Sequence, residues 1–177
     1  FTGTPLNADV GAINVKITTS DGSLSASDTF TLTVVNTNDD PTAVTLSATA
    51  IDENISGGVI GNLTTSDDDN VHGDSHTYVL SGVDADSFEV VNGQLKLKSG
   101  VSPNYETKSS YAVTVTSTDG SGSSFVQSFS LSINDVNEAP TDITLSANAI
   151  DENASGGTVI GSVGASDEDT GDSLTFS

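Results

Sequence analysis

The chain repeats a long segment of its own sequence. Residues 42–58, TAVTLSATAIDENISGG, return as residues 141–157, TDITLSANAIDENASGG. A period of about 100 residues is typical of tandem whole domains, because solenoid units repeat every ~20–50 residues. The chain is therefore expected to consist of consecutive domains of one kind.

The same self-similarity sets the expected domain boundaries. Residues 14–22 resemble residues 112–120, which lie in the second half of the complete unit. We expect the C-terminal half of a domain at 1–40, a complete domain at 41–139 and the N-terminal half of a following domain at 140–177.

Apolar residues alternate with Ser and Thr through most of the chain, as in strands with one face to solvent. Turn residues separate these strands, and Asn92-Gly93 predicts a two-residue hairpin loop with a primed turn. No segment has helical periodicity. About seven strands per unit predict an all-β fold, a tandem array of seven-stranded Greek-key β-sandwiches of the immunoglobulin-like kind. The alternation places at inward positions Val44, Leu46, Ala48, Ala50, Phe88, Val90, Leu95, Leu97, Tyr111, Val113, Val115, Phe129, Leu131 and Ile133.

The chain is strongly acidic, with 25 Asp and Glu against 4 Lys and Arg and a net charge of −21. Nucleic acid and anionic membrane surfaces are disfavoured as partners, because both are bound through Lys and Arg. No stretch approaches the ~20 apolar residues of a membrane span, so no membrane insertion is expected in this segment. The chain has no Cys, which excludes disulfide bonds and thiolate metal sites. Cations suit this composition better.

The acidic loops are predicted to gather at the two poles of the sandwich. In strands that run alternately down and up, odd-numbered strands end at one pole and even-numbered strands at the other. Loops after the first and fifth strands carry Glu53 and Glu106, and loops after the second and sixth carry Asp67, Asp69 and Asp119. Repelling carboxylates at a junction need a counter-cation. Hard oxygen donors without His or Cys select Ca²⁺, which accepts 6–8 oxygens in flexible geometry.

Five acidic motifs follow one another in this chain. They are Asp52-Glu53-Asn54, Asp67-x-Asp69, Asn104-Tyr105-Glu106, Ser117-Thr118-Asp119 and Asp135-Val136-Asn137-Glu138-Ala139-Pro140. Together they resemble the repeats of bacterial cadherins, as found in large secreted adhesins. The resemblance covers the middle unit completely and the flanking halves in part. The opening residues 1–11 are similar to the dystroglycan-type cadherin-like subfamily.

The resemblance implies calcium sites at two junctions between neighbouring units. Asn36 and Asn104 stand where the family usually has acids, and Glu138 replaces an Asp. Each Asn keeps an oxygen but drops a charge, so weaker or fewer sites are implied, and the C-terminal junction is expected to be the better one. The N-terminal junction would use Asp9, Asn36, Asn38, Asp39, Asp67, Asp69 and Asp119. The C-terminal junction would use Glu53, Asn104, Glu106, Asp135, Asn137, Glu138, Asp167 and Asp169.

Simpler interpretations compete with these sites. Asp and Asn are common in turns, so a single acidic loop indicates no more than a turn. His72 and His76 lie beside the Asp67-x-Asp69 loop and suggest a transition-metal site as an alternative, although a loop histidine is more often exposed. Neither histidine is accompanied by a nucleophile elbow, and the chain is not expected to be an enzyme.

The leading functional hypothesis is a calcium-rigidified stalk and adhesion repeat of a large extracellular protein, secreted or on a bacterial cell surface. The alternative is a calcium-dependent carbohydrate-binding or homophilic adhesive module, in which Tyr105 is the candidate to contact a sugar. The expected partners are neighbouring repeats of the same chain and, in the alternative, a surface polysaccharide. The complementary halves also allow head-to-tail self-association.

Overall fold

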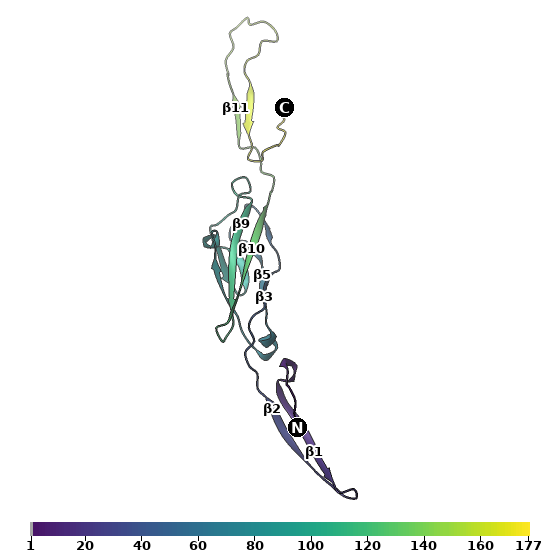
Figure 1. Cartoon of the computed structure of the whole chain (residues 1–177). Coiled ribbons are helices and arrows are strands. Elements are labelled where there is room, and N and C mark those ends of the chain that lie inside the picture. Colours follow the sequence, from purple (N-terminus) through teal and green to yellow (C-terminus); the bar gives the residue numbers. More distant parts are fainter. Residues whose placement is uncertain (1) are drawn as a thin grey trace.

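The computed structural model describes residues 2–177; Phe1, the first residue of the predicted N-terminal half-domain, lies outside the described residues. The molecule is elongated, with a two-stranded ribbon at each end and a two-sheet sandwich between them (Figure 1). The strands are β1 (Gly11–Ser20), β2 (Ser25–Val34), β3 (Ala43–Leu46), β4 (Ala50–Asp52), β5 (Val59–Ser66), β6 (Thr77–Ser81), β7 (Phe88–Val91), β8 (Gln94–Leu97), β9 (Ser110–Thr118), β10 (Ser124–Asn134), β11 (Asp142–Leu145) and β12 (Val163–Ser166), and the 3₁₀ turns are η1 (Asn7–Asp9), η2 (Asp68–His72) and η3 (Ala85–Ser87).

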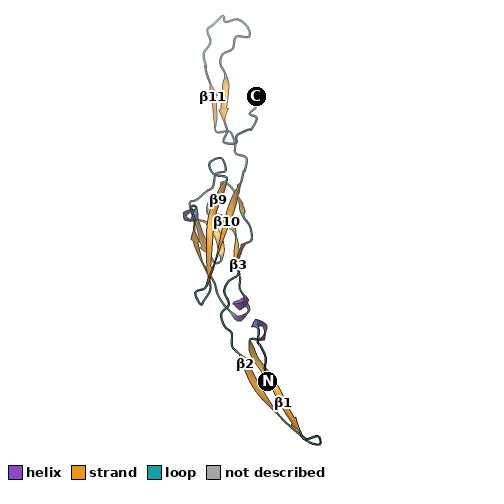
Figure 2. Ribbon diagram, viewed as in Figure 1, coloured by secondary structure: helices purple, strands orange, loops and turns teal. Residues whose placement is uncertain are grey.

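Strands β3 to β10 form the sandwich. One sheet has the order β3-β5-β8-β7 and the other the order β4-β10-β9-β6. Because β3 and β4 are two pieces of one first strand, these eight segments make a seven-stranded Greek-key sandwich. The predicted all-β fold is confirmed, and Figure 2 shows strands and loops with only short helical turns. Among residues 2–177, no helix is long and apolar enough to cross a membrane.

The first strand changes sheets halfway along its length. β3 pairs antiparallel with β5, and β4 pairs parallel with β10 in the opposite sheet. The predicted inward face is correct at Val44 but wrong at Ala48 and Ala50, which are exposed. The crossing changes which side of the strand faces the core, and Ile51 is buried in their place.

The core lies between the two sheets of the sandwich. Leu95, Leu97, Val115 and Leu131 are fully buried there, and each such side chain stabilises the fold by about 1.5–3 kcal/mol relative to exposure. Phe88 packs edge-on against Tyr111, with ring centroids 5.6 Å apart. The alternation of these positions along β8, β9 and β10 agrees with the predicted inward faces.

The hairpin between β7 and β8 has the predicted two-residue loop. Val91 pairs with Gln94, so that Asn92 and Gly93 alone form the connection. Their φ angles are 51° and 75°, the left-handed values that a type I′ turn requires at both positions.

The two ribbons reproduce parts of the sandwich. β11 pairs with β12 in the register of β3 with β5: Ala43 lies opposite Ser66, and Asp142 opposite Ser166. Val44 is 4 % exposed in the sandwich, whereas Ile143 at the corresponding position is 74 % exposed. β1 and β2 form the ribbon at the other end, with ten antiparallel residue pairs, and β9 and β10 in the sandwich form a similar antiparallel pair.

Candidate metal centres

Glu53 connects three segments at the C-terminal pole of the sandwich. It follows β4 directly, and its N–H donates to the carbonyl of Asn134 at the end of β10 (3.1 Å). The residue is 2 % exposed. Its Oε2 accepts from the N–H of Tyr105 and its Oε1 from the N–H of Val136, both at 2.8 Å. The carboxylate is therefore fixed by the loop after β8 and the linker after β10.

Two groups of carboxylates meet at Glu106. Carboxylate oxygens of Glu53, Glu106 and Asp135 lie within 4.8 Å of one another, and so do those of Glu106, Glu138 and Asp169. Asp169 follows β12, so the second group spans the boundary between the sandwich and the C-terminal ribbon. The N–H of Glu138 donates to Oδ2 of Asp169 (2.8 Å), which joins the linker to the ribbon.

Repulsion between the carboxylates of these two groups contributes to raised pKa values. Burial raises the pKa of Asp135, and the charges of Asp169 and Glu53 raise it further. Burial also raises the pKa of Glu138, followed by the charges of Glu53 and Asp169. A hydrogen bond from its own backbone N–H lowers the pKa of Glu106, but burial and the surrounding carboxylates outweigh it and raise the pKa overall. Ionising all of these groups together is unfavourable without a counter-charge.

Two oxygens at this junction are buried without a hydrogen-bond partner in the described chain: Oε2 of Glu106 and Oε2 of Glu138. Leaving a buried acceptor unsatisfied costs about 1–3 kcal/mol, and more for a charged group. In residues 2–177, the ion pairs of lysine are made elsewhere, by Lys96 with Glu89 (3.4 Å) and by Lys108 with Asp84. The donor set consists of oxygen alone, which fits Ca²⁺.

Asn104 lies beside the carboxylate groups with its amide already bonded. Its Oδ1 accepts from the N–H of Thr107 (2.7 Å), and its Nδ2 donates to Oε1 of Glu168 (2.6 Å). The amide of Asn54 donates to the carboxylate of Glu138 in a similar way. Sequence reasoning named Asn54 only as part of the Asp52-Glu53-Asn54 motif and missed Glu168, because neither side-chain contact follows from the spacing of the motifs.

Asn137 and Asp167 complete the set predicted for the C-terminal junction. Asn137 Nδ2 donates to the carbonyl of Glu138 (2.7 Å). Asp167 Oδ1 accepts from the N–H of Asp169 (3.2 Å) and so shapes the loop after β12. In the described chain, the carboxylate of Asp167 lies outside the two groups of carboxylates that meet at Glu106.

Asp69 is the central carboxylate of the N-terminal junction. The residue is 2 % exposed. Its Oδ2 accepts from the N–H of Asp39 (2.7 Å) and its Oδ1 from Nδ2 of Asn36 (2.8 Å). The N–H of Asp39 and then the amide of Asn36 lower the pKa of Asp69. This carboxylate is therefore stable as an anion in the junction.

Asp119 is held in the same manner from the turn between β9 and β10. Its Oδ2 accepts from Nδ2 of Asn38 (2.9 Å), and its Oδ1 accepts from the N–H groups of Ser121, Gly122 and Ser123. The amide of Asn38 is the largest cause that lowers the pKa of Asp119, and the turn N–H groups add to it. The linker before β3 is thus attached to the sandwich through the carboxylates of Asp69 and Asp119.

Unpartnered oxygens also occur at the N-terminal junction. Oδ1 of Asn36 and Oδ2 of Asp39 are buried without a hydrogen-bond partner in the described residues. Asn36 lines a polar hollow at this pole. Both oxygens are of the kind that hard cations bind as ligands. The hollow is formed by Asn36, Asn38, Asp69, His72, Gly73, Asp74 and Ser121.

Asp9 has a local partner in the structure. Its Oδ2 accepts from the N–H of Leu6 (2.9 Å) within the η1 turn. The residue that reaches the sandwich is Asn7, whose Nδ2 donates to Oδ2 of Asp68 (3.0 Å). Sequence reasoning missed this contact, because the asparagine belongs to none of the five acidic motifs.

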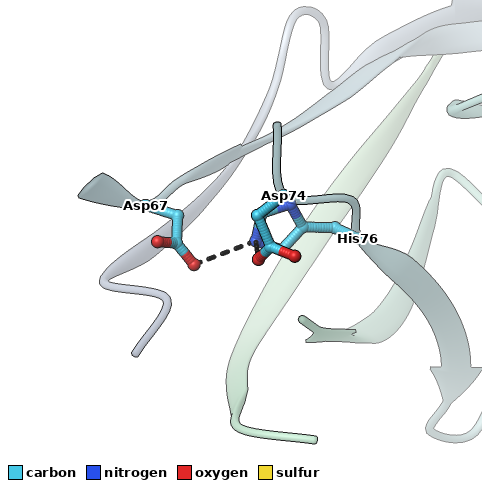
Figure 3. Close-up of side chains that lie close together, drawn as sticks. All are labelled: Asp67, Asp74 and His76. Atoms are coloured by element: carbon cyan, nitrogen blue, oxygen red, sulfur yellow. Dashed lines mark hydrogen bonds and ion pairs between the residues drawn. The ribbon is translucent and has the colours of Figure 1, made fainter. Parts of the chain in front are cut away.

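Asp67 faces a histidine. Its Oδ1 accepts from the N–H of Asp69 (2.9 Å) and caps η2. Its Oδ2 lies 3.1 Å from Nε2 of His76, and Oδ2 of Asp74 lies 3.9 Å from the same nitrogen (Figure 3). This corner of the N-terminal junction therefore combines two carboxylates with an imidazole.

The two junctions differ in what balances their carboxylates. At the N-terminal junction, amide and backbone N–H groups hydrogen-bond the anions and lower their pKa values. At the C-terminal junction, carboxylates face one another and their pKa values are raised. The C-terminal junction has the greater need for a bound cation.

The solved structures to which this chain is similar include fragments of protocadherins. The chain is similar to human protocadherin-24 EC1-2 at 28 % identity and a TM-score of 0.58, over 71 % of this chain and 58 % of that one. It is similar to PcdhgB3 EC1-4 at 21 % identity and a TM-score of 0.61, over 95 % and 43 %. It is similar to the protocadherin gammaB7 EC3-6 cis-dimer structure at 28 % identity and a TM-score of 0.52, over 92 % and 41 %.

These similarities identify the fold as cadherin-like. The chain spans 58 % of the protocadherin-24 fragment and less than half of the other two solved chains. The sequence matches no protein-family model, and a search of curated proteins gives no match.

Proposed function

We propose that this chain is part of a calcium-rigidified extracellular stalk in which cadherin-like repeats are joined end to end, and that it belongs to a large bacterial adhesin, secreted or at the cell surface. The observation that carries the proposal is the C-terminal junction. Five mutually repelling carboxylates meet there with two buried, unpartnered oxygens. Ca²⁺ accepts 6–8 oxygen ligands in flexible geometry, which suits this donor set.

The mechanism follows from where the carboxylates are attached. Glu53 and Glu106 belong to the sandwich, Asp135 and Glu138 to the linker, and Asp169 to the C-terminal ribbon. Cations bound at the two groups would supply the positive charge that lets all five carboxylates ionise together. Because Glu106 belongs to both groups, their ligands would tie the sandwich, the linker and the ribbon together, and bending at the linker would break ligand contacts. Without a cation, repulsion among the same groups favours separation of the ribbon from the sandwich.

The N-terminal junction is proposed to work in the same way but with weaker calcium binding. Asn36 and Asn38 already attach the linker to Asp69 and Asp119 by hydrogen bonds. Rotation of an Asn amide by half a turn exchanges its nitrogen for its oxygen, so either residue can present an oxygen to a cation. Each Asn contributes no charge, which reduces the affinity of the site.

The two ribbons are proposed to be halves of further repeats, at residues 1–40 and 140–177. The apolar side chains of β1 and β2 are about half exposed, among them Ile17 (55 %) and Phe30 (51 %). Covering such faces requires the rest of a sandwich or the complementary half of another copy. The second arrangement is the head-to-tail association expected from the sequence, and light scattering at high protein concentration separates the two.

The carbohydrate-binding alternative depends on Tyr105. The residue is 38 % exposed, and its N–H donates to Glu53. Its backbone is therefore part of the C-terminal junction, which favours a role in the stalk over recognition of a surface polysaccharide.

Small-angle X-ray scattering of the full chain tests the stalk mechanism. We expect Ca²⁺ to lengthen and narrow the distance distribution relative to chelator, whereas an equal concentration of Mg²⁺ does not. Asp169→Asn should abolish this response at the C-terminal ribbon, because Asp169 is the carboxylate contributed from beyond the linker. Asp142→Asn in β11 is the matched control, since Asp142 is an exposed acid of the same ribbon. Identical profiles of the wild-type chain with and without Ca²⁺ would refute the proposal.

A further inference from the structure

The side chains of Asp67, Asp74 and His76 form a partly buried cluster beside η2. The side chain of Asp67 is 0 % exposed, that of His76 is 7 % exposed and that of Asp74 is 16 % exposed. Asp67 directly follows β5, whereas Asp74 and His76 lie in the loop between η2 and β6. Figure 3 shows both carboxylates directed at the imidazole of His76.

The protein's own hydrogen bonds leave this cluster incomplete. A neutral imidazole has one N–H, and Nε2 of His76 is 3.1 Å from Oδ2 of Asp67 and 3.9 Å from Oδ2 of Asp74. It can therefore satisfy Asp67 but not both carboxylates. Oδ2 of Asp74 is indeed buried without a hydrogen-bond partner in the described chain. A cation between the three side chains would satisfy all of them.

The spacing of the three ligand atoms suits a small, tetrahedral cation. Zinc binds nitrogen and oxygen at about 2.0–2.2 Å, so two ligands of a tetrahedral site lie roughly 3.4 Å apart. The two distances from His76 lie on either side of this value, and all three ligand atoms are within 4.8 Å of one another. Imidazole is a ligand that zinc accepts readily and that hard cations such as Ca²⁺ do not prefer.

The repeat within the chain shows which residue makes this cluster different. Residues 73–78, GDSHTY, correspond to residues 171–176, GDSLTF. Asp167 and Asp172 match Asp67 and Asp74, but Leu174 stands where the middle unit has His76. The acids therefore occur in both units, whereas the nitrogen ligand occurs in one.

We propose that Asp67, Asp74 and His76 form a binding site for a transition-metal ion of the Zn²⁺ class. The fourth position of the tetrahedron is left to water. This site does not depend on the proposed calcium function, because its three ligands are complete without a neighbouring unit. Asp67 is also a predicted calcium ligand, so that zinc and calcium would compete for one carboxylate if both sites operate.

Isothermal titration of the full chain with zinc chloride tests the proposal, after removal of metal with chelator and in excess Mg²⁺ to occupy the remaining carboxylates. The wild-type chain should show a saturable site for one zinc ion. His76→Leu introduces the residue that the following unit has at this position, Leu174. It should weaken zinc binding at least about tenfold, because even changes to residues that only contact a ligand cost 10–100-fold in metal affinity. Asp74→Asn should weaken it too, because an amide oxygen replaces a carboxylate ligand.

The chain has 2 histidines, and the other one, His72, provides the matched control. His72→Asn should leave zinc binding unchanged. Circular dichroism of each variant verifies the fold, and Asp74→Asn keeps the test valid if His76→Leu does not fold. The proposal is overturned if the wild-type chain has no saturable zinc site, if His76→Leu binds zinc as tightly as the wild type, or if His72→Asn is the variant that loses binding. Calcium is absent throughout, so none of these outcomes bears on the stalk mechanism.

Discussion

Neutralising Glu106 is predicted to change the stability of the chain in opposite directions with and without calcium. Glu106 belongs to both groups of carboxylates at the C-terminal junction. In chelator, its raised pKa means that its ionised form is disfavoured in the folded state. Glu106→Gln removes this repulsion and should raise the melting temperature slightly. In calcium, the same change removes a ligand shared by both groups and should lower the melting temperature.

The size of the loss in calcium follows from linkage. An ion present at about 100 times its dissociation constant stabilises the folded state by ~2.7 kcal/mol. For a domain of about ninety residues, 1 kcal/mol corresponds to roughly 4–8 °C in melting temperature. Loss of one ion therefore lowers the melting temperature of the middle unit by about 10–20 °C, and loss of both groups by more.

Differential scanning calorimetry of the wild type, Glu106→Gln and a control across a calcium titration provides the measurement. The control is Asp86→Asn, an exposed acid in η3 with the same change of charge. Its melting temperature should follow that of the wild type at every calcium concentration. If Glu106→Gln is destabilised equally in chelator and in calcium, its carboxylate has only a structural role, and the cation-site reasoning is wrong.

Three further predictions test other parts of the structure. In chelator, three carboxyls at the C-terminal junction have raised pKa values, and they repel one another when ionised. This repulsion disappears as the pH falls through their folded-state pKa values toward the ordinary values of 4.5 for Glu and 3.8 for Asp. The melting temperature should therefore rise on acidification from neutral pH. Below 3.8 it should fall again, because Asp69 and Asp119 have lowered pKa values and lose hydrogen-bonded anions on protonation; a monotonic pH profile would contradict the assignment. Asn104→Asp should tighten calcium binding roughly tenfold, or about 1.4 kcal/mol, by restoring a ligand charge, and calorimetric titration measures it. Gly93→Ala should destabilise the sandwich by about 1 kcal/mol in both chelator and calcium, as read from denaturant midpoints, because Gly93 has φ 75° and open space around its Cβ position.

The sequence predicted the sandwich well where local rules determine it. Alternation along β8, β9 and β10 is a property of each strand alone, and the Asn92-Gly93 loop depends only on which residues tolerate positive φ. The prediction is wrong at Ala48 and Ala50 for a different reason. Alternation states which side of a strand is apolar, but it does not state which of two sheets the strand joins. The change of sheet between β3 and β4 is fixed by pairing with β10, a strand about eighty residues later.

The candidate junctions were predictable to the level of loops but not of atoms. Strand direction alone brings the loop of Glu53 and the loop of Glu106 to one pole. The contact of Asn7 with Asp68, and that of Asn104 with Glu168, depend on how adjacent units are placed against each other, which no strand pattern encodes. The contact of Asp67 with His76 joins the two sides of the η2 segment, and the following unit has Leu174 in place of His76.

The parallel pairing of β4 with β10 determines how the middle unit resists mechanical unfolding. The chain enters at the N-terminal pole and leaves at the opposite pole (Figure 1). Tension along the molecule therefore pulls β4 and β10 in opposite directions along their common axis. The bonds between them, such as Ser132 N–H to Thr49 carbonyl (2.8 Å) and Glu53 N–H to Asn134 carbonyl (3.1 Å), are loaded together in shear instead of being peeled one at a time. A tether built from such units would lengthen abruptly, one sandwich after another, only when the pull exceeds what a whole strand pair withstands.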